Sequence, residues 1–335
     1  MQNTALFDPW PPLAIEPVHI TQLTAQIGSS KQDGTLYLLI DPMLGEPRPL
    51  DGGPDAAPPE NTPTLQDSRT AAWDGRNITM LTFSEPPLPY AQLPYLVQLQ
   101  GKEDPLFAES IQIALENNLA LLERGFGGLP VCAWLQSHAS SDELAAWLVR
   151  MMQQRIKGHA GKRYLRAADP RTLPLLLALL GKERISLWLG PVSNWYFLSI
   201  DGRVTHLQST GGNKAMLVLK PHEAETILDA EAINRTLAQW YATRSAPYAQ
   251  MFLNARLWVK TARESGWPQT DDQLAFALHA DKYPQFWRHS SMTAIFKNAK
   301  ETQTPLNTAL AEITESQWDQ IMLNSPQKKT NDGYL

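Results

Sequence analysis

The sequence predicts a mixed α/β domain followed by an all-helical domain. Between Val131 and Val204, short apolar runs alternate with segments of helical periodicity, which is typical of a sheet covered by helices. Residues 1–105 hold 16 of the 26 prolines, so short strands and turns are expected there. After Gly212 only helical windows are found. We therefore expect an α/β domain over residues 1–212, with a central sheet flanked by helices, and an all-α lobe over 213–325.

The first third of the chain predicts two helices, three strands and a proline-rich insertion. Short apolar runs bounded by turn residues predict strands at Leu36–Asp41, Ile78–Phe83 and Tyr95–Leu99. Helical spacing predicts a short helix at Val18–Ile27 and a longer one at Leu106–Leu122, which ends before Gly125. Residues 42–72 are rich in proline and acids and hold almost no large apolar side chains. We expect this stretch to be a loop or insertion that does not order itself.

The middle of the chain predicts a second set of strands and helices. Ser140 and Glu143 have capping-box spacing and open a helix expected to reach Ile156. A further helix is expected at Leu173–Leu180, before Gly181. The predicted strands are Val131–Gln136, Tyr164–Ala168, Ile185–Leu189, Trp195–Ile200 and Arg203–Leu207. The last two flank Asp201-Gly202, which predicts a hairpin with a two-residue turn.

The C-terminal lobe predicts five helical windows, several of which begin near a proline. They are Pro221–Thr243, Pro247–Ser265, Thr270–His279, Pro284–Ala299 and Pro305–Leu323. Five of the eleven tryptophans lie in this lobe. Some of them must fill a helical core, and exposed ones are candidates for a binding groove. Residues 326–335 are expected to form a disordered tail.

The charge of the chain is unevenly distributed. The net charge is −5 overall, but it is −10 over residues 1–130, +6 over 131–219 and −1 over 220–335. The basic middle block could pair with the acidic first third, remain solvated, or bind an acidic partner protein. Nucleic acid is the less favoured partner, because a pI of about 5.8 implies repulsion of phosphates outside this block.

The composition also bears on where the protein works. No apolar run approaches the roughly 20 residues needed to cross a bilayer, and the first residues do not have the pattern of a secretory signal. Cys132 is the single cysteine and lies inside an apolar run, so we expect a buried, inert thiol and regard a catalytic thiol as the weaker alternative. These features favour a cytoplasmic protein without a membrane span.

A search for catalytic and metal-binding motifs yields one weak candidate. The seven histidines show no ligand spacing, and there is no GxSxG, Walker or GxGxxG pattern. Gly125–Gly128 is glycine-rich, but the Lys-Ser/Thr of a phosphate loop is missing. Asp41 and Asp169 each end an apolar run and precede a proline. If their strands were parallel neighbours, the two acids could serve a hydrolase, with His138 as a further candidate.

A structural role for the two aspartates is the favoured interpretation. Arg166 and Arg171 flank Asp169, and their positive charges would lower its pKa rather than raise it toward general-acid chemistry. We therefore expect Asp41 and Asp169 to fix turns, and we expect no catalytic residue, cofactor or metal. The hydrolase and a nucleic-acid-binding module using residues 150–184 stay open as alternatives.

The order of several short motifs resembles a known family. The motifs are LYLLID, LPYLVQL, CAWLQS leading into SSDELAAWLVRMM, KRYLRAADPRTLPLLLALL and LWLGPVSNWYFLSIDG, within residues 36–200. They resemble the type VI secretion effector adaptor or chaperone family, built on the domain of unknown function numbered 4123. The Arg166–Arg171 run, Arg-x-x-Asp-Pro-Arg, is the most specific part. Residues 45–69 look longer than the family pattern and would be a private insertion.

The resemblance implies a non-catalytic, cytoplasmic protein of a Gram-negative bacterium. Such adaptors bind a toxic effector and load it onto the VgrG spike before secretion. In that case one lobe would hold the effector and the other the spike protein, in an order that the sequence does not specify. The residues expected to bind the partners are basic side chains of the middle block and aromatic side chains of the C-terminal lobe: Arg150, Arg155, Arg163, Arg166, Arg171, Trp240, Trp258 and Trp287.

Overall fold

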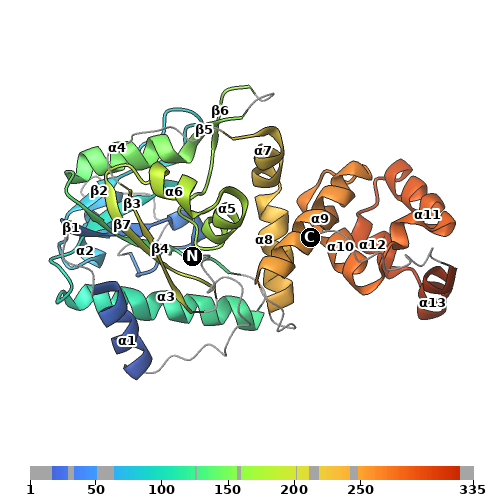
Figure 1. Cartoon of the computed structure of the whole chain (residues 1–335), viewed down its shortest axis with the longest axis horizontal. Helices are drawn as coiled ribbons and strands as arrows, with labels where there is room; N and C mark the ends of the chain where they lie inside the picture. Colours follow the sequence, from blue (N-terminus) through green and yellow to red (C-terminus); the bar gives the residue numbers. More distant parts are fainter. Residues whose placement is uncertain are drawn as a thin grey trace. The chain divides into compact units, whose positions relative to one another are not determined.

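A six-stranded antiparallel sheet forms the centre of the N-terminal unit (Figure 1). The computed structural model describes residues 17–28, 34–50, 64–124, 127–156, 160–200, 202–210, 219–241 and 248–324. The strand order is β2-β3-β1-β4-β7-β8. The strands are β1 (Thr35–Ile40), β2 (Ile78–Met80), β3 (Tyr95–Gln98), β4 (Val131–Ser137), β7 (Val192–Leu198) and β8 (Val204–Gln208). Every neighbouring pair is antiparallel. The strand near Asp169, β6 (Lys162–Tyr164), is not part of this sheet, so the parallel arrangement considered for the strands before Asp41 and Asp169 is wrong.

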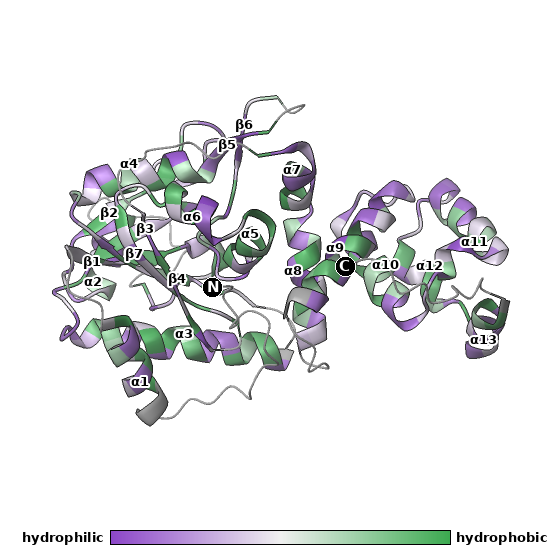
Figure 2. Cartoon of the chain, viewed as in Figure 1, coloured by the Kyte–Doolittle hydropathy of each residue, from purple (hydrophilic) through white to green (hydrophobic). Residues whose placement is uncertain are grey.

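Helices cover both faces of this sheet, which confirms the predicted fold class. One face packs on α1 (Pro17–Gly28) and α3 (Pro105–Arg124) through side chains such as Ile27, Phe107 and Ile111. The other face packs on α4 (Ser141–Met152), α5 (Thr172–Leu180) and α6 (Lys182–Trp188). Alternate residues of β1 enter opposite cores, as Leu38 and Leu39 do. The apolar colouring of α5 in Figure 2 agrees with its burial.

Two predicted strands of the middle block have a different structure. Residues 185–189 belong to α6 and its end, where Ile185, Trp188 and Leu189 follow helical spacing and are all buried. Only Tyr164 of the predicted strand Tyr164–Ala168 is in a strand. It ends β6 (Lys162–Tyr164), which pairs with β5 (Gln153–Arg155) as a separate two-stranded ribbon. The helix begun by the Ser140 capping box therefore ends at Met152, four residues before the predicted end.

The hairpin of β7 and β8 is confirmed, but its turn is longer than predicted. The N–H of Ser199 donates to the carbonyl of Arg203 at 2.8 Å, and the N–H of Gly202 donates to the carbonyl of Ser199 at 2.8 Å. Three residues thus connect the last hydrogen-bonded pair. Gly202 has φ +78°, the left-handed conformation that such loops need at this position. Asp201 lies outside the described residues.

Both flanks of the proline-rich stretch are ordered, which corrects the expectation for residues 42–72. Its end forms α2 (Leu65–Ala72), and its start forms the short helix η2 (Pro42–Leu44). Arg69 of α2 is fully buried, bonds Glu46 and lies 4.4 Å from the ring centroid of Tyr95. Arg48 makes a bidentate ion pair with Glu109 of α3. These contacts supply the burial that the stretch's own composition does not provide. Residues 51–63 lie outside the described residues.

The chain divides into two compact units near residue 228, later than the change in composition at Gly212. The first unit comprises Met1–Ile227 with Tyr241–Pro247, and the second comprises Leu228–Trp240 with Tyr248–Leu335. Helix α7 (Pro221–Leu228) joins the first unit because Ile227 enters its core and Glu223 pairs with Arg184 of α6 at 2.5 Å. The change in composition at Gly212 therefore follows the last strand that the structure describes, and it does not mark the boundary between the units.

The second unit is helical, as predicted, but with shorter elements. It holds α8 (Ala230–Tyr241), α9 (Tyr248–Glu264), α10 (Thr270–Lys282), η4 (Phe286–Arg288), α11 (Ser290–Glu301), α12 (Leu306–Ala311) and α13 (Glu315–Asn324). Three predicted windows are each split in two. In the last window, Thr314 and Gln317 form a capping box that starts α13. The predicted tail, residues 326–335, lies outside the described residues.

None of the described helices is both long enough and apolar enough to cross a membrane. The short helix η3 (Tyr90–Gln92) completes the described elements and precedes β3.

Candidate functional site

Asp41 and Arg166 form a buried ion pair at the end of β1. Asp41 directly follows the strand, and its side chain caps η2 by accepting the N–H of Met43 at 3.0 Å. Its other carboxylate oxygen accepts Nε and Nη2 of Arg166 at 3.2 and 3.0 Å. Asp41 is 2% exposed. All the described hydrogen bonds of this carboxylate are therefore local capping or ion pairing, as a structural role requires.

Asp169 and Arg171 form a second ion pair close to the first. Oδ1 of Asp169 accepts the backbone N–H and Nε of Arg171 at 2.9 and 3.1 Å, and Oδ2 accepts Nη2 at 2.8 Å. The carbonyl of Asp169 accepts the N–H groups of Thr172 and Leu173, which starts α5. Arg171 also donates to the carbonyl of Gly127 at 3.3 Å, in the segment before β4. The Arg-x-x-Asp-Pro-Arg run thus joins α5 to the main sheet.

The pKa values of the two acids shift in opposite directions, although each ion pair by itself lowers the pKa of its acid. Burial raises the pKa of Asp41 above its usual value, and Arg166 opposes this shift only in part. Burial alone would also raise the pKa of Asp169, but the charges and hydrogen bonds of Arg171, with the charge of Arg166, hold it below its usual value. A negative charge on Asp169 further disfavours ionisation of Asp41. The fold therefore brings the two acids together, with their charge balanced by two arginines.

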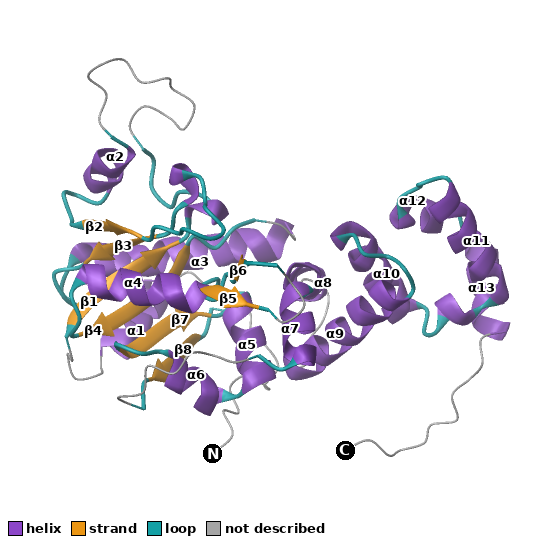
Figure 3. Ribbon diagram, turned by 90° about the horizontal axis from the view of Figure 1, so that it is seen from above, coloured by secondary structure: helices purple, strands orange, loops and turns teal. Residues whose placement is uncertain are grey.

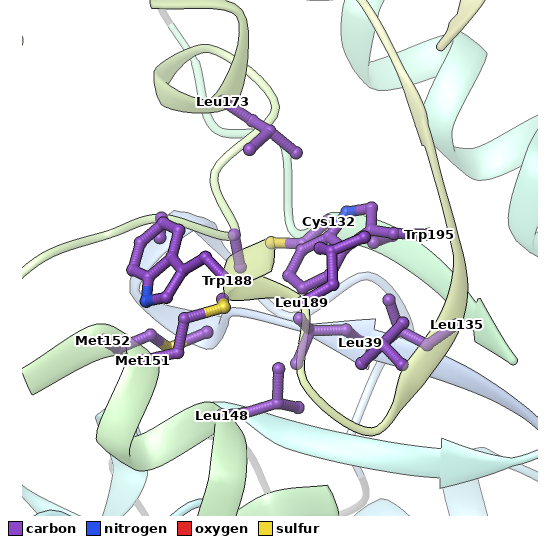
Figure 4. Close-up of a cluster of buried hydrophobic side chains, with 14 of the residues drawn as sticks. Leu39, Cys132, Leu135, Leu148, Met151, Met152, Leu173, Trp188, Leu189 and Trp195 are labelled. Atoms are coloured by element: carbon purple, nitrogen blue, oxygen red, sulfur yellow. The ribbon is translucent and has the colours of Figure 1, made fainter. Parts of the chain in front are cut away.

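Cys132 lies in the core beside these ion pairs. It is fully buried in the same cluster as Leu39 and Trp195 (Figure 4). Burial raises the pKa of its thiol well above the usual value, and the nearby charges of Asp41 and Asp169 raise it further. The expectation of a buried thiol is confirmed, and these surroundings keep it protonated.

His138 does not belong to this cluster. In the antiparallel register Ile40 pairs with Val131 and Thr35 pairs with Ser137, so Asp41 and His138 follow opposite ends of the paired strands. At about 3.4 Å per residue, the two are separated by roughly 20 Å. The set of Asp41, Asp169 and His138 considered for a hydrolase is therefore not assembled. Among the described residues, no group of three or more His, Cys, Asp or Glu side chains is placed to hold a metal ion.

The expected partner-binding arginines fall into two groups. Arg166 and Arg171 are half-buried in the ion pairs described above, so their charge is compensated within the fold. Arg150, Arg155 and Arg163 are exposed. Arg150 lies in the last turn of α4, and its guanidinium carbon lies 5.2 Å from the ring centroid of Trp147. Only these three remain candidates for contact with a partner.

The β5–β6 ribbon brings three positively charged side chains close together. Their positions opposite one another follow from the strand pairing and not from the sequence order alone. Arg155 lies directly opposite Lys162, and Arg163 lies opposite Gln154. Within the described ranges, no carboxylate forms an ion pair with the side chains of Arg155, Lys162 or Arg163. The nearest acid is Glu85, whose carboxylate accepts the backbone N–H of Lys162 at 3.2 Å. Like charges facing each other across a strand pair are destabilising. Lys162 is not among the predicted partner-binding residues, because its place opposite Arg155 depends on the register of the ribbon.

The three candidate tryptophans of the second unit are less accessible than expected. Trp240 is buried, which corrects its assignment as an exposed partner-binding residue. Trp258 and Trp287 are half-buried and pack edge-to-face, with ring centroids 5.2 Å apart. They border a core that contains Phe276 and Phe286. These two tryptophans therefore pack against the helical core.

The glycine run before β4 has a packing role at Gly128. A Cβ on Gly128 would lie 1.8 Å from the carbonyl oxygen of Leu44, so only glycine fits beside η2. Gly125 and Phe126 lie outside the described residues. Close packing, rather than phosphate binding, explains the requirement for glycine at position 128.

Comparison of this chain with protein-family models, curated proteins and solved structures finds no match.

Proposed function

We propose that this protein is a non-catalytic, cytoplasmic adaptor or chaperone of a type VI secretion system. It would bind a toxic effector and load it onto the VgrG spike. The proposal rests on two features: the order of the short motifs along residues 36–200, and the exposed basic side chains of the first unit. In this account the Arg166–Arg171 run builds the scaffold, and exposed cations near it contact the partner.

The observation that carries the proposal is the excess of positive charge on the β5–β6 ribbon, where three cations lie beside the single carboxylate of Glu85. Arg155, Lys162 and Arg163 project from a short two-stranded element, and Arg155 and Lys162 face each other. Gathering like charges opposes folding of the ribbon, whereas an acidic partner would turn the same charges into an attraction. A surface of this kind gives an incoming protein both orientation and rapid association. We therefore assign the ribbon to contact with an acidic protein surface.

A double charge reversal tests this assignment. Full-length wild type and the variant Arg155→Glu/Arg163→Glu are titrated against a purified candidate effector and, separately, against purified VgrG. We expect the variant to bind one of these partners at least about tenfold more weakly, with a lower association rate. The control Lys102→Glu/Lys182→Glu makes the same change in net charge at exposed positions outside the ribbon and is expected to bind as wild type does. Equal binding by wild type and the ribbon variant would remove the ribbon from the interface.

The nucleic-acid alternative makes a different prediction for the same proteins. In that case the protein would bind a single-stranded or duplex oligonucleotide, and the logarithm of the association constant would fall steeply and linearly with the logarithm of the salt concentration. The adaptor proposal predicts no oligonucleotide binding at physiological salt. Oligonucleotide binding that the ribbon reversal abolishes, without effector or VgrG binding, would replace the proposal with the alternative.

A further inference from the structure

The strand β2 is an edge strand of the central sheet, and some of its backbone groups have no hydrogen-bond partner among the described residues. It is the outermost strand of the sheet order (Figure 3). The N–H of Leu81 donates to Pro94, and the carbonyl of Asn77 accepts from Gln98, so the alternate residues 77, 79 and 81 face β3. The backbone groups of residues 78, 80 and 82 consequently point away from the sheet.

The outward backbone groups differ along this edge: a side chain bonds the one at Ile78, and those of the following residues have no described hydrogen bond. The carbonyl of Ile78 accepts Nε2 of Gln66, a residue of α2, at 3.2 Å. For Met80 and Thr82, no hydrogen bond to the outward backbone groups comes from any residue that the structure describes. Open strand edges of this kind are ready to pair with another strand.

A shallow groove runs along the open part of the edge. Its volume is about 390 Å³. One wall is the edge itself, with Thr79, Met80 and Thr82. The other wall is a single stripe of α4, whose members recur at helical spacing: Asp142, Ala145, Ala146, Val149 and Arg150. A strand added to β2 would direct alternate side chains toward this stripe.

The chemistry of the groove specifies its occupant. Ala145, Ala146 and Val149 are small and apolar, so the middle of the groove accepts small apolar side chains. Arg150 lies at the end nearest the basic ribbon, since α4 leads directly into β5. The ribbon is joined to the segment after β2 by a hydrogen bond of 2.8 Å from Nε2 of Gln153 to the carbonyl of Glu85. Acidic side chains of the occupant would meet positive charge at this end.

We infer that an extended segment of the partner protein adds to the sheet as a strand beside β2. Its backbone pairs with the outward groups of Met80 and Thr82, its small apolar side chains enter the α4 groove, and its acidic residues reach Arg150 and the ribbon. This inference rests on the proposed function in one respect, that the chain holds another protein. It goes further by giving the mode of contact and the pattern of the bound segment.

A proline substitution tests the backbone pairing. Met80→Pro removes an outward N–H while leaving the hydrogen bonds of residues 79 and 81 to β3 in place. Met80→Ala is the matched control, because it truncates the same side chain and keeps the N–H. Each variant is titrated against the purified candidate effector and purified VgrG after its melting temperature is measured. We expect Met80→Pro to bind its partner at least about tenfold more weakly than Met80→Ala does.

A second variant keeps the test decisive if Met80→Pro disrupts the pairing of β2 with β3. Ala146 is exposed on α4, so Ala146→Trp fills the groove from a position where a large side chain is tolerated. We expect the same loss of binding without a loss of stability. In hydrogen-exchange measurements on the wild-type complex, the amides of Met80 and Thr82 are expected to become protected.

The outcomes separate this inference from the proposed function. Wild-type binding by both Met80→Pro and Ala146→Trp, with binding lost in the ribbon reversal, overturns strand addition and leaves the adaptor proposal intact. Wild-type protein that binds neither effector nor VgrG overturns both. A concentration-dependent dimer that Met80→Pro abolishes would assign the edge to a second copy of this chain and contradict the inference.

Discussion

Arg166 places Nη2 3.0 Å from Oδ2 of Asp41, a residue 125 positions earlier in the chain. This contact holds the turn after the β5–β6 ribbon against the end of β1. Asp169 and Arg171, three and five positions further along, repeat the arrangement and continue into α5. The Arg166–Arg171 run therefore has a structural role, because its two ion pairs link the end of β1, the turn after the exposed basic ribbon and the start of α5.

Removal of Arg166 should destabilise the first unit. In Arg166→Gln the carboxylate of Asp41 stays buried without its cation, which costs about 3 kcal/mol, at the lower end for buried pairs because Arg166 is partly exposed. The double variant Asp41→Asn/Arg166→Gln removes both charges and should lose less stability than the single variant. Urea unfolding of the three proteins measures this difference. A single variant within about 0.5 kcal/mol of wild type would show that the ion pair does not support the fold.

Asp169 should contribute stability that depends on pH. Because its pKa is lowered in the folded state, its contribution is complete above the usual aspartate pKa of about 3.9 and is lost as pH falls through the folded-state value. Asp169→Asn should therefore cost about 3 kcal/mol at pH 7 and progressively less below about pH 4. Thermal unfolding across this range tests the prediction, with the exposed Glu103→Gln as control. A deficit that does not change with pH would exclude the charge as its origin.

Gly190 should tolerate no side chain because of Trp147. A Cβ at this position would lie 2.1 Å from Cε2 of the indole, and the backbone φ of +58° already disfavours other residues. Gly190→Ala should lose more than about 3 kcal/mol, from the conformational cost and displacement of the ring. Gly75→Ala is the control, with φ +74° and open space around it, and should lose only about 1–2 kcal/mol. Equal losses in urea unfolding would mean that Trp147 moves aside freely.

Trp318 should anchor the last helix of the second unit. It is 5% exposed, and its ring stacks on that of Tyr283 with centroids 4.0 Å apart. Trp318→Ala should destabilise this unit by about 3–5 kcal/mol. Leu323 on the same helix is 83% exposed, so Leu323→Ala should change stability by less than about 0.5 kcal/mol. Far-UV circular dichroism is the measurement, because the helical signal does not depend on the tryptophan that the first variant removes.

The predictable parts of the fold are those governed by local chemistry. The capping box of Ser140 and Glu143 located the start of α4 because both hydrogen bonds form within one turn. The prediction of a strand at 185–189 is wrong, since a short run with four apolar residues in five fits a strand and the buried side of a helix equally well. Thr314 and Gln317 carried a signal for the start of α13 that the longer predicted window obscured.

The candidate site depends on contacts that a single sequence does not reveal. Local charge favoured a structural role for Asp169 beside Arg171, and the structure contains that pair. The partner of Asp41 was not predictable, because Arg166 approaches it only through the tertiary fold. The facing charges of Arg155 and Lys162 follow from the register of a ribbon, and the open edge at Met80 follows from the strand order. Both are properties of pairing between distant segments.

The most direct test of the adaptor proposal is the composition of the complex that this protein forms. The full-length chain, a candidate effector and VgrG from the same genome are mixed at micromolar concentrations, and the mass of each complex is measured by light scattering after size-exclusion chromatography. The account predicts a ternary complex, with effector reaching VgrG only when the adaptor is present. Absence of a complex with either partner, or equal loading of the effector without this chain, would contradict it.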